Sequence, residues 1–308
     1  MKKYINNSFC IYIFVMSLLS SPLFYVPNKD TYPPFKKGYY LEEFFFLYMK
    51  NNNKKYSVDG RLYLPILWTN FQIEDWFQYR KQEMQKVLNE YINTNPCEKG
   101  YFTVVQHDSG PMLILPVNTV VYGACSGNIP LPLIYQDTEN KLENIPKKNF
   151  HKKNILCSFV GANTHTLRNI IYSRYYNNHN FRFIVNGGWT ADVEKYKQDN
   201  YIQTTINSKF ALAPRGFGRS SFRFFEIFKL GTIPIYVWDD IEWLPYKDIL
   251  DYSKFCVSIN INELDKLENI LLNIDEEKYK EMIFEYENIK KYFEMEYMCE
   301  FIENYKTY

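Results

Sequence analysis

The arginines of this chain are concentrated in one segment. Lysine is the default cation, with 28 lysines against 8 arginines, yet six of the arginines lie between positions 168 and 223. These six are Arg168, Arg174, Arg182, Arg215, Arg219 and Arg223. A planar guanidinium group pairs with phosphate through two parallel hydrogen bonds. The cluster therefore favours the recognition of a phosphate group.

The segment 215–221 reads Arg-Gly-Phe-Gly-Arg-Ser-Ser and is the part of the cluster best suited to holding a phosphate. Gly216 and Gly218 carry no Cβ, so the backbone can approach a ligand closely. Ser220 or Ser221 can cap the helix that is predicted to follow, and the free N–H groups at the start of a helix attract anions. The segment therefore predicts an anion site.

Arg223 and Glu226 lie three residues apart in the predicted helix and so share one face of it. An acid beside a phosphate is tolerated where it accepts hydrogen bonds, and the hydroxyl groups of ribose donate them. Phosphate and ribose together indicate a nucleoside diphosphate. The alternative is a surface ion pair beside a flexible loop. The segment lacks both the Gly-Lys-Ser/Thr of a P-loop and the Gly-x-Gly-x-x-Gly of a dinucleotide site.

Length and composition narrow the class of protein. The chain has 308 residues, which is enough for about two domains. Its 46% hydrophobic and 23% charged residues are typical of a globular protein and not of a disordered one. A formal net charge of +1 argues against a nucleic acid partner. The six cysteines include no Cys-x-x-Cys pair and have no histidine cluster beside them, so we expect buried free thiols and no metal site.

Residues 1–26 form an apolar leader behind Lys2 and Lys3. The run at 9–19 is typical of a signal peptide, and its extension to Val26 gives about the length of a membrane span. The alternative is a buried first strand, Ser-Pro-Leu-Phe-Tyr-Val, behind a short leader. Two localisations stay open: association with a membrane through the N-terminus, or the cytoplasm.

Predicted strands and helices alternate in the second half of the chain. The strands are expected at 155–161, 181–188, 209–214, 232–238 and 255–259. Between the first two strands we expect a helix at 164–176, capped by Thr164 or Thr166. Alternation with short connections indicates a parallel, doubly wound sheet, so the predicted class is α/β.

The polar and basic stretch 140–154 is the best linker in the sequence. We therefore expect an N-terminal Rossmann-like domain at 27–145 and a second one at 146–292. A last helix at 293–308 is expected to pack back on the N-terminal domain.

The stretch from about 210 to 274 resembles the donor half of the exostosin-type glycosyltransferases, glycosyltransferase family 47. Shared positions are Pro214, Gly216, Ser221, Arg223, Glu226, Gly231, Ile233, Pro234, Asp240, Pro245, Leu250 and Asp251. Upstream, Phe159-Val160-Gly161 followed by Arg168 is similar to the family's Phe-x-Gly…Arg segment, and 101–110 is similar to its His-Asp segment. The chain departs from the pattern at four packing positions, Ala213, Ile227, Thr232 and Tyr252.

The resemblance implies a GT-B-like architecture of two Rossmann-like domains that face a cleft. It also implies an inverting glycosyltransferase that moves a sugar from a nucleotide-sugar donor to a hydroxyl group of a glycan or glycoconjugate. No cofactor or metal ion is required if cationic side chains neutralise the diphosphate. The alternatives are a catalytically inactive nucleotide- or glycan-binding protein and a retaining or phosphorylase-type enzyme on the same scaffold.

The resemblance also assigns roles to individual residues. Arg215, Arg223, the amides of 218–221 and Arg168 would stabilise the leaving group, Glu226 would hold the ribose, and Gly161 would allow close approach. Asp239-Asp240 follows a strand, where acceptor contacts or helix capping are expected and a manganese site is not. The base that deprotonates the acceptor would be Asp108 or His107, and His107 can instead be a structural residue of its turn.

Overall fold

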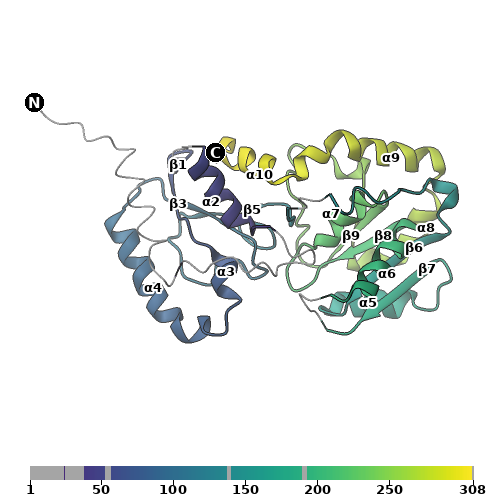
Figure 1. Cartoon of the computed structure of the whole chain (residues 1–308), viewed down its shortest axis with the longest axis horizontal. Helices are drawn as coiled ribbons and strands as arrows, with labels where there is room; N and C mark the ends of the chain where they lie inside the picture. The colour runs from purple at the N-terminus through teal and green to yellow at the C-terminus, as the bar shows by residue number, and fades with distance from the viewer. Residues whose placement is uncertain (1–23, 25–37, 53–56, 137–139, 189–192, 307–308) are drawn as a thin grey trace, which may run out of the picture. The chain divides into compact units, whose positions relative to one another are not determined.

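The computed structural model describes residues 24, 38–52, 57–136, 140–188 and 193–306. These residues divide into two compact units. Unit 1 contains Phe24 and residues 38–131 and 295–306, and unit 2 contains residues 132–294. Figure 1 labels the elements of both.

Unit 1 is built on a five-stranded sheet with the order β1-β2-β3-β4-β5. The strands are β1 (Ser57–Val58), β2 (Arg61–Tyr63), β3 (Tyr101–Val105), β4 (Val120–Gly123) and β5 (Ile129–Pro130). Strand β1 pairs antiparallel with β2, whereas β2 to β5 are parallel. All five residues of β3 are buried, as expected of a central parallel strand.

In the described residues of unit 1, helices pack beside the sheet. They are α2 (Leu41–Asn51), α3 (Trp68–Gln72), α4 (Phe77–Thr94) and α10 (Met295–Asn304). Helix α4 buries Phe77, Met84, Leu88 and Tyr91, whose spacing places them on one face. This face packs in a core with Trp68, Phe71 and Val105. Helix α10 packs against α2, although it is the last element of the chain (Figure 1).

Unit 2 contains a five-stranded sheet in which every pairing is parallel. The strands are β6 (Ile155–Ala162), β7 (Phe181–Asn186), β8 (Ser208–Pro214), β9 (Ile233–Trp238) and β10 (Val257–Asn260). Their order is β10-β9-β8-β6-β7, so the direction of winding reverses between β6 and β8. This is a doubly wound sheet, and it confirms the predicted α/β class.

Helices cover both faces of the unit 2 sheet. They are α5 (Thr166–Tyr175), α6 (Lys195–Ile206), α7 (Phe222–Lys229), α8 (Leu264–Leu272) and α9 (Glu276–Ile289). Leu167 of α5, Leu267 of α8 and Met282 of α9 share one core with Phe159 of β6. The next residue of β6, Val160, packs in a separate core with Tyr201 and Ile206 of α6. Successive residues of the strand therefore serve opposite faces. Short 3₁₀ turns span Phe150–Lys152, Tyr252–Lys254, Ile261–Glu263 and Lys290–Phe293.

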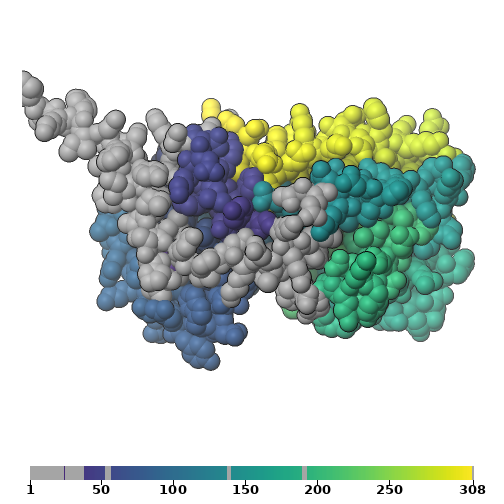
Figure 2. All heavy atoms as spheres, in the orientation of Figure 1, coloured from purple at the N-terminus to yellow at the C-terminus, as the bar shows by residue number. Residues whose placement is uncertain are grey.

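The two units divide at residues 131/132, earlier than the predicted boundary at 145/146. The stretch expected to be a solvated linker packs on unit 2 instead. Leu142 is fully buried in the core that contains Val160 and Tyr201. Phe150 contacts the ring of Tyr279 at 5.2 Å, and this segment lies alongside α9 in Figure 2. A single buried leucine produces no apolar periodicity in a basic stretch. The packing of this stretch on unit 2 could therefore not be predicted from its composition.

The apolar leader lies outside the described residues, except for Phe24. That side chain is fully buried, and its ring meets Phe71 edge-on at 5.9 Å. In the part of the chain that the structure describes, no helix combines the length and apolarity that crossing a membrane requires.

Candidate functional site

The direction of winding in the unit 2 sheet reverses between β6 and β8. This reversal places the turns after these two strands at one edge of the sheet. Arg168 of α5 joins them: its guanidinium nitrogens donate to the carbonyl oxygens of Ala162 (2.7 Å), Pro214 (3.1 Å) and Arg215 (2.9 Å). The predicted role of Arg168 was a phosphate contact. In the structure it fixes the carboxyl ends of both strands relative to each other. Ligands of doubly wound sheets bind at this kind of edge.

Two glycines of this edge, Gly216 and Gly161, have close protein neighbours. A Cβ at Gly216 would lie 3.3 Å from Nη2 of Arg168 and 3.3 Å from Oγ1 of Thr164. A Cβ at Gly161 would approach the ring of Phe159 to 3.0 Å. Gly218 is buried. A side chain at Gly216 would therefore press on the guanidinium group that holds β6 and β8 together.

Arg215 and Arg219 are paired with two acids that follow β9. Nη1 of Arg215 lies 2.9 Å from Oδ1 of Asp239 and 3.2 Å from Oδ1 of Asp240. Arg219 donates to Oδ2 of Asp240 at 2.7 Å. Partial burial would raise the pKa of Asp240, but the hydrogen bond from Arg219 and the charges of both arginines lower it to about 2. A turn and not a helix follows these acids, so they cap no helix.

Arg223 and Glu226 form a pair in the interior of unit 2. Nη1 of Arg223 donates to Oε2 of Glu226 at 2.9 Å, and Nε donates to the carbonyl oxygen of Val160 at 3.1 Å. The other oxygen of Glu226 accepts from the hydroxyl of Tyr135 at 3.2 Å. The Glu226 side chain is only 3% exposed, so the alternative of a surface ion pair is wrong. The guanidinium group of Arg223 also stacks 3.9 Å from the ring of Tyr201.

The start of α7 completes this edge. Ser221 is the N-cap, and its side chain accepts from the N–H of Arg223 at 3.4 Å. Ser220 is buried next to it. Of the two predicted caps, Ser221 is the one used. The next N–H of the first turn, that of Phe224, donates to the carbonyl oxygen of Ser221 at 3.0 Å.

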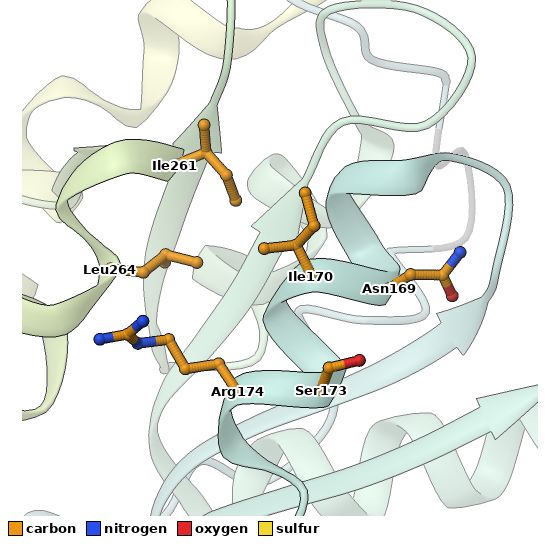
Figure 3. A pocket seen from close by; sticks show the side chains of 6 residues that line it. All are labelled: Asn169, Ile170, Ser173, Arg174, Ile261 and Leu264. Atoms are coloured by element: carbon orange, nitrogen blue, oxygen red, sulfur yellow. The ribbon is translucent and has the colours of Figure 1, made fainter.

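Four of the six clustered arginines meet at this edge, and two do not. Arg182 is exposed on β7. Arg174 lies on the outer side of α5, where it lines a hollow of about 450 Å³ beside the start of α8 (Figure 3). The other residues of that hollow are Asn169, Ile170, Ser173, Ile261 and Leu264.

Unit 1 presents His107 and Asp108 directly after the buried strand β3. His107 is half-buried, and its Nδ1 accepts a hydrogen bond from the N–H of Ser109 at 3.2 Å. Burial lowers the pKa of His107, and the charge of Asp108 opposes this shift. Asp108 itself is exposed. The two residues thus lie at the carboxyl edge of the sheet, where sequence reasoning expected them.

A fully buried carboxylate, Glu42, holds the backbone that leads to this turn. Its two oxygens accept from the N–H groups of Thr69 (2.6 Å) and Gln106 (3.1 Å). In return, Oε1 of Gln106 accepts from the N–H of Leu41 at 3.1 Å. Helix α2, helix α3 and the end of β3 are therefore joined through side chains. Sequence reasoning missed Glu42, because acids in the first turn of a helix are common and Glu42 is followed by a second one, Glu43.

Comparison with known proteins identifies the family of this chain. The family model described as the Exostosin GT47 domain matches residues 88–274, which is more than half of the chain. The chain belongs to the exostosin GT47 family. All residues predicted for the site, from His107 to Asp240, lie within this exostosin domain, whereas Glu42 precedes it.

Individual relatives agree with this exostosin assignment. A probable glycosyltransferase of Arabidopsis thaliana is 33% identical over 92 residues, which cover 30% of this chain and 19% of that protein. The exostosin-1 homolog of Caenorhabditis elegans is 23% identical over 177 residues, which cover 50% of this chain and 46% of that protein. The chain thus spans less than half the length of these relatives. Among solved structures, TarM aligns with a TM-score of 0.34 at 12% identity, over 70% of this chain and 57% of TarM.

Within the described ranges, histidine, cysteine, aspartate and glutamate side chains form no group of three or more that could hold a metal ion. Five cysteines of these ranges, Cys97, Cys125, Cys157, Cys256 and Cys299, are free thiols.

We expect Glu42→Gln to lower the free energy of unfolding by about 1–3 kcal/mol, because an amide N–H₂ would face one of the two backbone N–H donors. Burial raises the pKa of Glu42 to about 7 from its ordinary value near 4.5. The stability that protonated Glu42 contributes is therefore full below pH 4.5 and is lost as the pH rises through 7. The difference in free energy of unfolding between parent and variant should therefore shrink as the pH rises over this range.

Urea denaturation at pH 5, 6, 7 and 8 measures this difference. The control is Glu43→Gln, which changes the neighbouring, half-buried acid and should show a smaller effect. Equal stability of parent and Glu42→Gln at pH 5 would contradict the assignment.

Proposed function

We propose that this chain is an inverting glycosyltransferase that moves a sugar from a nucleotide-sugar donor to a hydroxyl group of a glycan or glycoconjugate. The observation that carries the proposal is the convergence of Arg215, Arg219 and Arg223 with the start of α7 at the reversal point of a doubly wound sheet. Membership in the exostosin family supports glycosyl transfer as the reaction. The activity of the longer relatives is attributed to this chain only as part of the proposal.

The donor diphosphate would bind at this edge of unit 2. Its oxygens would accept from Arg215 and Arg219 near the start of α7, replacing the pairing with Asp239 and Asp240. Glu226 is held from two sides by Arg223 and Tyr135, and we propose that one of its oxygens is shared with a ribose hydroxyl. The guanidinium groups supply the charge that the departing diphosphate needs, so the proposal requires no metal ion.

In the proposed reaction, the acceptor oxygen forms a bond to the anomeric carbon as the bond from that carbon to the diphosphate oxygen breaks. Attack from the side opposite the leaving group inverts the configuration. The acceptor proton passes to Asp108. His107 is the weaker candidate, because its Nδ1 already accepts a hydrogen bond and a neutral ring then carries its hydrogen on Nε2. We therefore propose Asp108 as the base and His107 as a residue of the turn.

A screen of nucleoside diphosphates by thermal shift tests the donor site. A diphosphate at 100 times its dissociation constant should add about 2.7 kcal/mol to the free energy of unfolding. A panel of UDP- and GDP-sugars with glycan acceptors then tests transfer, and NMR of the product gives its anomeric configuration. Binding of a diphosphate without transfer would favour an inactive binding protein. The absence of any shift would contradict the proposed donor site.

A further inference from the structure

The turn between β6 and α5 contains a histidine that the sequence analysis did not use. His165 is the N-cap of α5, in place of the predicted Thr164 or Thr166. Its Nδ1 accepts a hydrogen bond from the N–H of Leu167 at 3.2 Å. A ring nitrogen that accepts a hydrogen bond carries no proton of its own. The neutral ring therefore carries its hydrogen on Nε2.

This Nε2–H group points toward the edge where the arginines meet. Nε2 lies 4.0 Å from Oδ2 of Asp239, and the other oxygen of that carboxylate is bonded to Arg215. A distance of 4.0 Å is too long for a hydrogen bond. Within the described residues, His165 Nε2 thus donates to no acceptor, although its side chain is only 25% exposed. A half-buried donor without an acceptor is suited to a ligand.

The surroundings of His165 lower its pKa and so favour its neutral ring. Partial burial lowers its pKa, and the nearby Arg215 and Arg168 lower it further, while Asp239 and Asp240 oppose the shift. A neutral ring can keep its Nδ1 acceptor for the cap and its Nε2 donor for a ligand at the same time. A protonated ring could not, because Nδ1 would then repel the N–H of Leu167.

We propose that His165 is a phosphate ligand of the nucleoside diphosphate, to which its Nε2–H donates. This inference rests on the proposed function. Arg215 and Arg219 reach the edge from the turn after β8, whereas His165 reaches it from the turn after β6. The diphosphate would therefore be held from both sides of the reversal point. An oxygen of the diphosphate would accept the hydrogen bond from Nε2–H of His165, because the nearest carboxylate oxygen of Asp239 is too far away to accept it.

Two substitutions separate the role of His165 as the N-cap of α5 from its role as a hydrogen-bond donor to the ligand. His165→Ser keeps an oxygen that caps α5 but removes the Nε2 donor. His165→Gln supplies an amide donor at similar reach and gives up the favoured cap. Calorimetry with UDP should show the serine variant binding about tenfold or more weakly than the parent, at an unchanged Tm. The glutamine variant should regain part of the affinity while its Tm falls.

The same titrations with uridine and with an exposed-histidine control, His179→Ser, complete the test. The effect of His165→Ser should be confined to UDP, and His179→Ser should bind like the parent. Parent-like UDP affinity in His165→Ser would overturn the inference and leave the proposed function standing. An equal loss of affinity for UDP and for uridine in His165→Ser would also overturn the inference. So would a UDP affinity in His165→Gln that is no higher than in His165→Ser. A parent that binds no nucleoside diphosphate would instead contradict the proposed function itself.

Discussion

Arg223→Ala should lower the free energy of unfolding by about 3–5 kcal/mol, because it leaves a buried carboxylate without its cation. Glu226 is 3% exposed, and the substitution would leave its carboxylate with the hydroxyl groups of Tyr135 and Tyr201 but with no cation. The substitution also removes the bond from α7 to the carbonyl oxygen of Val160 on β6. Urea denaturation followed by circular dichroism measures the loss.

The double variant Arg223→Met/Glu226→Leu distinguishes the cost of the unpaired acid from a loss of packing. Removing both charges should restore most of the stability, since buried ion pairs are often replaceable by apolar residues. The restored variant should still fail to bind UDP, because it lacks the proposed ribose contact of Glu226 and the positive charge of Arg223 at this edge. Arg182→Ala, at an exposed position on β7, is the matched control and should match the parent in both measurements. Nucleotide binding by the double variant would refute the role of this pair in the donor site.

Asp108→Asn should reduce the rate of sugar transfer about 10²–10⁴-fold, the usual contribution of a general base. Asparagine has nearly the same shape but cannot accept the proton of the acceptor hydroxyl. Asp108 is exposed at the end of β3, so its substitution should leave the Tm close to that of the parent. Initial rates with a UDP-sugar and a saturating acceptor measure the effect on kcat.

His107→Gln is the comparison for this experiment. If His107 serves the turn through the N–H of Ser109, its substitution should lower the Tm more than it lowers kcat. The binding of UDP should be unchanged in both variants, because both residues belong to unit 1 and the proposed donor site belongs to unit 2. A larger loss of kcat in His107→Gln than in Asp108→Asn would assign the base to the histidine.

Features with a local cause were predictable from the sequence. The alternation of apolar runs with turn residues predicted β6 to β10, and the pair Ser220-Ser221 predicted the start of α7, without deciding which serine is the cap. Gly231 follows the end of this helix, and its φ of 68° is the left-handed backbone that glycine favours. Each of these signals lies within a few residues of the feature that it specifies.

Features that join distant segments were not predictable. The pairing of Arg215 and Arg219 with Asp239 and Asp240 connects the turns after β8 and β9, and it needs the register of the sheet. The cap of α5 was assigned to threonine by residue type, whereas the orientation of His165 decides it. Glu42 acts on two backbone segments far from it in sequence. Composition and spacing do not show which distant segments of the chain come into contact.

Helix α10 has a consequence for the biosynthesis of this protein. It packs against α2, the hydroxyl of Tyr48 donates to Glu303 at 2.8 Å, and Tyr305 meets the ring of Tyr122 edge-on. A ribosome therefore has to translate all of unit 2 before the last buried residues of unit 1 leave the exit tunnel. Unit 2 is nearly continuous in sequence and can fold while the nascent chain is still tethered. Unit 1 is completed only after α10 has been translated, so part of its core stays uncovered while unit 2 is being synthesised.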